Sequence, residues 1–329
     1  MHQSIEIKIE NLIIKGDFEK ATKELEALTK EEIETQELDQ IPMWISYDKA
    51  NICGYGFACY LTSLHESSAN YILVSKTLEF GMPQVEGSYA VAYHRTKMAI
   101  ELDPENKDLY LYLLSFYSVP ESQISTAEAR EIAKKYLSKW PNEASATDIL
   151  ESTAEYADLD NYSKEELIKK NFYLEKQEAL KTCILQGWFL ETQKYLQEFS
   201  NEEVENILLN IAKEKRNVCA YDYVWFLIRE KGISTKKHLL LATISQYLFE
   251  YKENAWWNIS KGSKQLYFFH INQAAKLEPE NLEIQEKLLK LYEPDNQCFD
   301  LEETKALVER ILKVNPKNQA ALRVLNLIG

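Results

Sequence analysis

The sequence contains few of the residues that interrupt helices. It has nine glycines and eight prolines among 329 residues. Both residues break helices when they fall inside them, and an all-β protein of this length needs many more turn residues. The scarcity of glycine and proline therefore excludes an all-β fold and favours helices joined by short turns.

Long apolar runs are missing as well. No window approaches the roughly 18 consecutive apolar residues expected of a membrane-spanning helix. The residues from Met1 to Glu6 lack the basic and apolar regions of a secretory signal peptide. We therefore expect a cytoplasmic protein with no membrane partner. The usage of lysine, isoleucine and asparagine is typical of a bacterial chain.

The cysteines and histidines do not form a recognisable site. The five cysteines are widely scattered, which is not a disulfide framework, and no pair has the C-x-x-C spacing of a zinc or redox site. We expect reduced thiols that are mostly buried. No two of the five histidines have the i, i+4 spacing of metal ligands on one helix face. The sequence therefore predicts no metal site.

Motifs for catalysis are also missing. The sequence has no G-x-S-x-G elbow, no P-loop and no dinucleotide-binding glycine pattern. Gly54 and Gly56 lack the Lys-Ser/Thr pair or further glycine of a phosphate-binding loop, so close packing of helices is the better interpretation. Pairs of carboxylates are too common in this chain to single out an acid and a base. We expect no catalytic residue, no cofactor and no enzymatic activity.

The charge of the chain is unbalanced. The formal net charge is −14 and the pI is near 5.0. Nucleic-acid binding depends on lysine and arginine contacts to phosphates, and short basic clusters such as Lys134-Lys135 are flanked by acids. Nucleic acid is therefore not an expected partner. An acidic protein would instead meet a basic partner faster.

Helix periodicity is visible in many windows. Val204, Ile207, Leu208 and Ile211 fall at i, i+3, i+4 and i+7, which gathers them on one helix face. Near the N-terminus, alternating isoleucines fit a strand, but the residues that follow favour a helix. Capping pairs, in which a Ser, Thr or Asp precedes a Glu by three residues, predict helix starts at Thr29/Glu32, Ser125/Glu128, Ser163/Glu166, Ser200/Glu203 and Asp300/Glu303.

A short segment recurs along the chain. Residues 99–106, Ala-Ile-Glu-Leu-Asp-Pro-Glu-Asn, match residues 274–281, Ala-Ala-Lys-Leu-Glu-Pro-Glu-Asn, and residues 311–318 are a weaker copy. Each copy joins the end of an apolar helix to a turn with proline and then to another apolar helix. The helix that follows also matches, because residues 113–117 resemble residues 288–292.

These residues resemble the tetratricopeptide repeat, a helix–turn–helix unit of about 34 residues. Gly87, Ala92, Ala99 and Pro104 fall where the family places its turn glycine, two small alanines and closing proline. Residues 16–21 match the first half of the pattern. The resemblance implies an all-α fold, an α-α superhelix or solenoid of about eight or nine helix pairs. It would form one elongated domain over residues 1–329.

The spacing of the repeats is uneven. They are clearest in residues 87–141 and 262–329, and a divergent middle region covers residues 142–258. The interval from Pro104 to Pro141, like that from Pro279 to Pro316, is slightly longer than the family's period. In the middle region the sequence predicts helices but shows no repeat consensus.

The resemblance also implies where a partner binds. Tetratricopeptide arrays usually bind along a concave face lined by the first helix of each unit. The Lys/Asn clamp that some members use on a peptide's terminal carboxylate is not evident. Clustered aromatic residues add candidate interface anchors. The candidate binding residues are Asp108, Leu111, Tyr112, Ser115, Glu283, Glu286, Lys287, Lys290, Trp256 and Trp257.

Three hypotheses for function follow. Stacked repeats bury a continuous core and leave an extended binding face, so we expect a non-catalytic adaptor, regulator or inhibitor that binds a protein or peptide. A sharper form is an acidic immunity protein or antitoxin that neutralises a basic toxin. The third is an enzyme whose site is assembled from distant repeats, which sequence spacing does not exclude. The sequence leaves the partner and the oligomeric state open.

Overall fold

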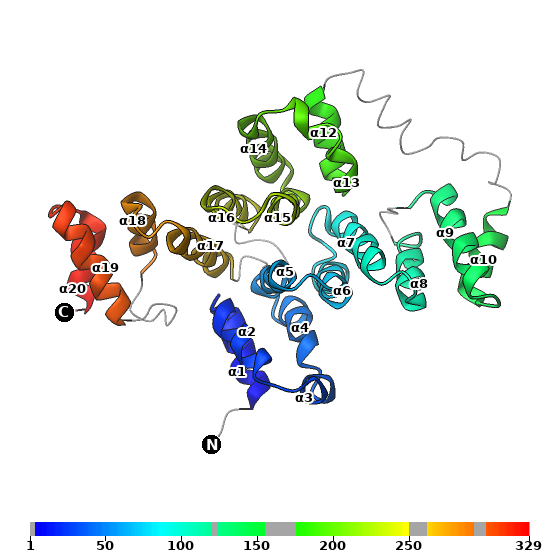
Figure 1. The fold of residues 1–329 in the computed structure, drawn as a ribbon, viewed down its shortest axis with the longest axis horizontal. Coiled ribbons are helices and arrows are strands. Elements are labelled where there is room, and N and C mark those ends of the chain that lie inside the picture. The colour runs from blue at the N-terminus through cyan, green and yellow to red at the C-terminus, as the bar shows by residue number, and fades with distance from the viewer. Residues whose placement is uncertain (1–3, 120–123, 155–175, 250–261, 293–300, 329) are drawn as a thin grey trace. The chain divides into compact units, whose positions relative to one another are not determined.

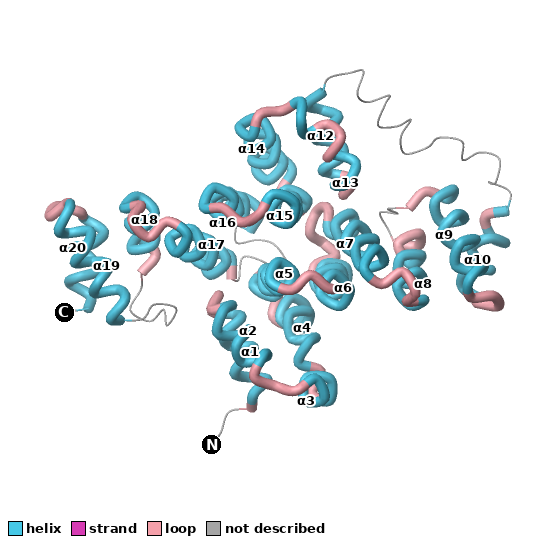
Figure 2. Tube along the Cα trace, viewed as in Figure 1, coloured by secondary structure: helices cyan, strands magenta, loops and turns pink. Residues whose placement is uncertain are grey.

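A computed structural model of the protein describes residues 4–119, 124–154, 176–249, 262–292 and 301–328. Every element in these residues is a helix or a helical turn, as Figures 1 and 2 show. The prediction of an all-α fold is therefore confirmed. Close contacts divide the chain into two compact units. The first unit comprises Met1–Tyr60 and Val224–Gly329, and the second comprises Leu61–Tyr223.

The first unit begins with a helical hairpin. The Ser4 hydroxyl caps the first helix by accepting a hydrogen bond from the Ile7 amide at 3.4 Å, and Ile9 and Ile13 are buried. The prediction of a helix at the N-terminus is therefore confirmed. The elements of this segment are α1 (Ile5–Ile14), α2 (Phe18–Glu26), α3 (Lys30–Thr35), the 3₁₀ turn η1 (Leu38–Gln40), α4 (Ile41–Asp48) and the start of α5 (Cys53–Leu64).

The rest of the first unit comes from the C-terminal part of the chain. Its core contains Phe268, Ile271, Leu289, Val308 and Val324, which come from helices that follow one another in the chain. The elements are the end of α15 (Cys219–Lys231), α16 (Thr235–Phe249), α17 (Ser263–Leu277), α18 (Leu282–Lys290), α19 (Leu301–Val314) and α20 (Gln319–Ile328).

The second unit is continuous in sequence. Tyr71, Met98 and Leu109 form one of its buried clusters, and Tyr110 and Tyr136 belong to another. The elements that follow α5 are α6 (Ser68–Lys76), the π turn η2 (Thr77–Gly81), α7 (Ser88–Leu102), α8 (Lys107–Ser115), α9 (Thr126–Lys139), α10 (Ala144–Ser152), α12 (Lys176–Leu185), α13 (Phe189–Thr192), the 3₁₀ turn η4 (Leu196–Glu198), α14 (Asn201–Asn210) and the π turn η5 (Ile211–Lys215).

The helix starts follow the predicted capping pairs. Thr29 and Ser200 each form a complete capping box with the glutamate three residues later. The Ser125 hydroxyl accepts the hydrogen bond from the Glu128 amide at 3.1 Å. These three predictions are confirmed. Ser163 and Asp300 lie outside the described residues.

The two units begin their hairpins in the same way. Gly16 and Gly187 each turn the chain at positive φ, and each is followed two residues later by a buried phenylalanine. A Cβ atom on Gly16 would lie 2.8 Å from the Gln265 carbonyl oxygen, and one on Gly187 would lie 2.4 Å from that of Ala90. Glycine is therefore needed at both turns, because the hairpin packs directly against the backbone of a later or earlier helix.

The start of α5 and the start of α15 are held by the same set of contacts. The Asn51 side-chain oxygen accepts a hydrogen bond from the Cys53 amide at 2.9 Å, and the Cys53 thiol donates to the Gly262 carbonyl at 3.4 Å. In the second unit, the Asn217 side-chain oxygen accepts from the Cys219 amide at 2.8 Å, and the Cys219 thiol lies 3.8 Å from the carbonyl oxygen of Gly87. The sequence repeats too, as Asn51-Ile52-Cys53 and Asn217-Val218-Cys219.

The structure therefore contains an internal repeat that spans half of the chain. The first copy runs from α1 to α10 and the second from α12 to α20. Gly262, Pro279 and Pro316 follow Gly87, Pro104 and Pro141 at one constant offset. Each unit combines the beginning of one copy with the end of the other. The region predicted as divergent, residues 142–258, contains the beginning of the second copy.

Candidate binding grooves

The first unit contains a groove of about 320 Å³ that we call the α17 groove. It lies among α17, α18, α19 and the start of α2. The buried side chains of Phe268, Leu288 and Leu307 form its apolar floor. Its rim is polar and carries both signs of charge, from Asp17, Glu19, Lys20, Lys23, Asn272, Gln273, Lys276 and Glu303.

Glu19 organises the rim of the α17 groove. Its carboxylate accepts hydrogen bonds from the Lys276 ammonium at 2.6 Å and from the Gln273 amide at 2.8 Å. Partial burial alone would raise the pKa of Glu19, but these two donors outweigh it and lower the pKa below its usual value. Glu19 is therefore held as a carboxylate that ties α2 to α17.

The second unit contains the equivalent groove, which we call the α7 groove, with a volume of about 260 Å³. It lies among α7, α8 and α9. At the constant offset, Tyr93 corresponds to Phe268, Leu113 to Leu288 and Ile132 to Leu307. The remaining lining residues are Lys97, Ile100, Glu101, Tyr110, Glu128, Glu131 and Lys135.

Paired side chains also organise the rim of the α7 groove. The Tyr93 hydroxyl donates to the Glu128 carboxylate, and the Lys97 ammonium lies 3.8 Å from the same carboxylate. Burial, reinforced by the charge of Glu128, raises the pKa of Tyr93 well above its usual value. The two rims differ in charge, because Lys97 and Glu101 stand where the α17 groove has Asn272 and Lys276.

Each unit has a buried polar centre, and the two centres share one equivalent position. In the second unit, Arg95 and Asp222 form a buried two-pronged ion pair, with nitrogen–oxygen distances of 2.9 and 2.8 Å. The Tyr71 ring lies 5.5 Å from the guanidinium carbon. In the first unit, His270 stands where the constant offset places Arg95, and it pairs with His238.

The two histidines meet through their Nδ1 atoms. These atoms lie 3.2 Å apart in a buried site beside the Trp225 ring. Burial lowers the pKa of His238 to about 4 and holds the pKa of His270 well below its usual value. Both imidazoles are therefore neutral near pH 7, and one Nδ1 donates a hydrogen bond to the other. This pair packs within the core of the unit and lines neither groove.

A third groove lies between α1 and α4 in the first unit. This α1–α4 groove encloses about 620 Å³. Trp44 is 45% exposed in it, and its ring lies 6.4 Å from that of the exposed Tyr47. The other lining residues are Glu6, Glu10, Ile41, Ile45, Asp48 and Lys49.

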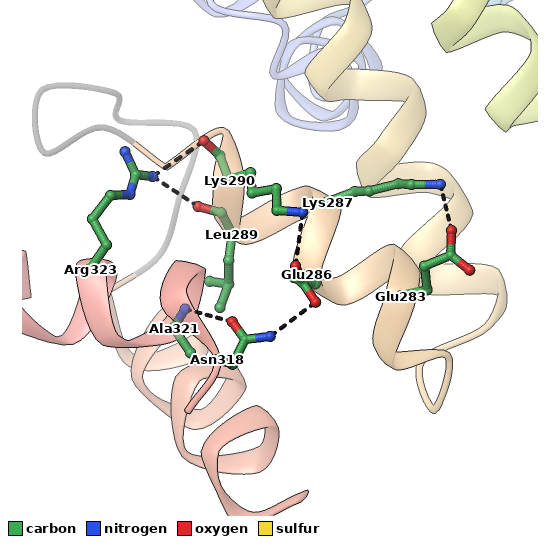
Figure 3. A network of polar contacts seen from close by, with 8 residues as sticks. All are labelled: Glu283, Glu286, Lys287, Leu289, Lys290, Asn318, Ala321 and Arg323. Atoms are coloured by element: carbon green, nitrogen blue, oxygen red, sulfur yellow. Dashed lines mark hydrogen bonds and ion pairs between the residues drawn. The ribbon is translucent and has the colours of Figure 1, made fainter. Parts of the chain in front are cut away.

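The predicted binding residues of α18 are engaged in polar contacts within the chain (Figure 3). Lys287 pairs with Glu283 at 2.9 Å, and Lys290 pairs with Glu286 at 2.8 Å. The Asn318 amide donates to Glu286 at 2.9 Å and so links α18 to α20. The α17 groove meets α18 at Leu288 instead.

The predicted binding residues of α8 differ in exposure and in contacts. Asp108 is exposed, and Leu111 packs against the cluster of α8, α9 and α10. Tyr112 accepts a hydrogen bond from the Ser75 hydroxyl at 3.2 Å, and the Ser115 hydroxyl donates to the Tyr112 carbonyl. None of the four residues lines the α7 groove. Trp256 and Trp257 lie outside the described residues.

The described cysteines and the glycines of α5 have the environments predicted for them. Cys53, Cys59, Cys183 and Cys219 are free and buried, as predicted, and Cys298 lies outside the described residues. A Cβ atom on Gly54 would lie 2.2 Å from the Pro42 carbonyl oxygen. One on Gly56 would lie 2.4 Å from a Leu266 methyl group. Both glycines are therefore positions of close packing, which confirms the prediction made for them.

No group of three or more His, Cys, Asp or Glu side chains in the described part of the chain could hold a metal ion. Of the helices in the ranges that the structure describes, none has the length and apolarity needed to cross a membrane.

The sequence contains a signal for the grooves in its recurring apolar positions. Reasoning from the first helix of each repeat points to α8 and α18, whereas most groove residues lie on the neighbouring helices α7, α9, α17 and α19. The signal is the pair of apolar positions that recur at the constant offset, Leu113 and Leu288.

No protein-family model matches the chain, and no curated protein is significantly similar to it.

Proposed function

We propose that the protein is a non-catalytic scaffold that binds a protein or peptide partner through the α17 and α7 grooves. The observation that carries this proposal is that six lining positions of the α7 groove recur in the α17 groove at the constant offset. Each groove has an apolar floor and a charged rim, which is the construction of protein-binding surfaces. A tetratricopeptide-like superhelix belongs to the same proposal, supported by the succession of helix pairs from α7 to α10 and from α17 to α20.

The titratable groups of the grooves also favour binding over catalysis. A general acid or base works best when its pKa lies near the operating pH. In the α17 groove, the pKa of Glu19 is lowered, and in the α7 groove, that of Tyr93 is raised. Both shifts move the pKa of the group away from pH 7, so each group keeps one protonation state at that pH. Such groups suit fixed electrostatic contacts with a partner.

The proposal is tested by filling each groove with a bulky side chain. Asn272→Trp and Lys97→Trp change equivalent, partly buried positions on the two rims. Glu309→Trp and Lys134→Trp are matched controls, because both residues are exposed, occupy equivalent positions on α19 and α9, and line neither groove. Proteins captured from a lysate of the native organism are identified by mass spectrometry for the native chain, the two single groove variants, their combination and the two controls.

We expect a stoichiometric partner that both control variants retain and the combined groove variant loses. The single variants then show which groove carries the contact. A partner that the combined variant retains would place the binding site elsewhere. Capture of no specific protein by the native chain would contradict the scaffold proposal itself.

An acidic inhibitor of a basic protein is the second candidate. The observation that favours it is the net charge of −14. Electrostatic attraction between exposed charges is screened by salt, with a Debye length of about 10 Å at 0.1 M ionic strength. Capture that weakens steeply with added salt and yields a basic partner would support this candidate. Capture that is insensitive to salt would contradict it.

A further inference from the structure

The α1–α4 groove arises where the two copies of the repeat differ in length. In the second copy, α14 continues directly into η5 between the cap at Ser200 and the junction at Asn217. The first copy is five residues longer between the equivalent residues Thr29 and Asn51, and it is divided there into α3, η1 and α4. Counted back from Asn51 and Asn217, Ile41 and Ile45 of α4 match the buried Ile207 and Ile211. Trp44 and Tyr47 stand where the second copy has Asn210 and Lys213, so these two aromatic residues are particular to the first copy.

The two faces of α4 differ in burial. Ile41 and Ile45 are 5% and 1% exposed and attach the helix to the unit. Trp44 and Tyr47, on the same helix, keep 45% and 50% of their surfaces exposed. Trp and Tyr are enriched among residues that dominate binding at protein interfaces. Their exposure leaves a large aromatic surface available to a partner.

The charge around Trp44 is negative. Glu6, Glu10 and Asp48 line the groove together with a single cation, Lys49. Lys49 pairs with Glu10. Across the described ranges, no lysine or arginine pairs with Glu6 or Asp48. Two carboxylates beside an exposed indole are therefore uncompensated, and they would repel nucleic acid or an anionic lipid surface.

We infer that the α1–α4 groove is a docking surface for a protein segment that presents lysine or arginine. A cation over the Trp44 ring would gain from the ring's quadrupole, and its charge would be balanced by Glu6 and Asp48. The segment would cover the aromatic face that α4 leaves exposed. This inference goes beyond the proposed function, because the α1–α4 groove shares no residue with the α17 or α7 groove.

The test uses the full chain and a fluorescent peptide of alternating arginine and serine. Binding is followed by fluorescence anisotropy, and a glutamate–serine peptide of equal length controls for adhesion. Trp44→Ala removes the ring, and the double variant Glu6→Gln/Asp48→Asn removes both charges with almost no change of shape. The matched control is Glu31→Gln/Glu202→Gln, which removes two exposed carboxylates from α3 and α14.

We expect Trp44→Ala and the double charge variant each to weaken binding by about three- to tenfold, in line with a partly exposed cation–π contact. The matched control and the Asn272→Trp/Lys97→Trp variant should bind the peptide as the native chain does. This last result separates the inference from the proposed function, whose test concerns the other two grooves.

Three results would overturn the inference. In the first, the peptide binds equally to the native chain, to Trp44→Ala and to the double charge variant. In the second, the glutamate–serine peptide binds as tightly as the arginine–serine peptide. In the third, free arginine amide competes as effectively as the whole peptide, which would identify a small cationic ligand in place of a protein segment.

Discussion

At the scale of single residues, the two units differ most in their buried polar centres. Arg95 and His270 stand at positions related by the constant offset, but Arg95 pairs with Asp222 and His270 with His238. The sequence shows no spacing of the five histidines that indicates a metal site. It does not reveal that His238 meets His270, because they lie on different helices and no short-range spacing connects them. Contacts of this kind follow from tertiary packing alone.

The Arg95–Asp222 pair should contribute strongly to the stability of the second unit. Asp222→Ala leaves a buried guanidinium without its carboxylate, so we expect the free energy of unfolding to fall by about 3–5 kcal/mol. The double variant Arg95→Met/Asp222→Ala removes both charges and should recover most of that loss. Urea titrations followed by circular dichroism measure both values. A double variant as unstable as Asp222→Ala alone would contradict this account.

The histidine pair should make the first unit sensitive to acid. The folded state lowers the pKa of His238 from 6.5 to about 4, so the unfolded chain binds more protons between these values. Stability is then complete above pH 6.5 and falls as the pH drops from 6.5 towards 4. We expect His238→Leu/His270→Leu to lose less stability than the native chain between pH 7 and pH 5 in urea titrations. Equal losses would show that other groups dominate.

At the scale of helices, much of the structure could be predicted. The helix at α1, the capping boxes at Thr29 and Ser200 and the turns at Gly87 and Gly262 follow from local sequence. The beginning of the second copy could not be recognised by a period of one helix pair, because the repeat extends over half of the chain. Unequal lengths between Thr29 and Asn51 and between Ser200 and Asn217 also shift its register.

Gly87 should be far less tolerant of substitution than Gly232. Both have positive φ, but a Cβ atom on Gly87 would lie 2.2 Å from the Asn217 side-chain oxygen, whereas one on Gly232 meets nothing within 4 Å. We expect Gly232→Ala to cost about 1–2 kcal/mol of unfolding free energy, the cost of the left-handed backbone alone. Gly87→Ala should cost more, because it also displaces the Asn217 cap. Thermal or urea unfolding of the two variants compares them, and equal losses would contradict the close contact.

At the scale of the whole chain, neither unit corresponds to one copy of the repeat. The first unit needs residues before Tyr60 and residues after Val224, which belong to different copies of the repeat. The one elongated domain predicted from the sequence stays a prediction. The tetratricopeptide resemblance predicts helix pairs that stack in chain order. It gives no indication that a segment near the N-terminus packs against helices near the C-terminus.

Cleavage between the two copies should therefore leave them associated. A protease site introduced between Ser152 and Lys176 separates the copies without cutting a described helix. We expect the two fragments to elute together in size-exclusion chromatography and to separate only in denaturant, because each unit draws on both fragments. The uncut chain is the reference. Fragments that separate under native conditions would contradict the conclusion that each unit is built from segments of both copies.

The presence of both copies in one chain also affects how the grooves can change during evolution. If two identical chains each supplied one groove, every substitution would appear in both grooves at once. Neither groove could then acquire a preference for a different partner. When both copies share one chain, the equivalent positions vary independently. Lys97 opposite Asn272 and Glu101 opposite Lys276 are such differences. The hairpin glycines Gly16 and Gly187, in contrast, are the same in both copies, so the scaffold is conserved where the units are assembled and free to diverge where a partner would be recognised.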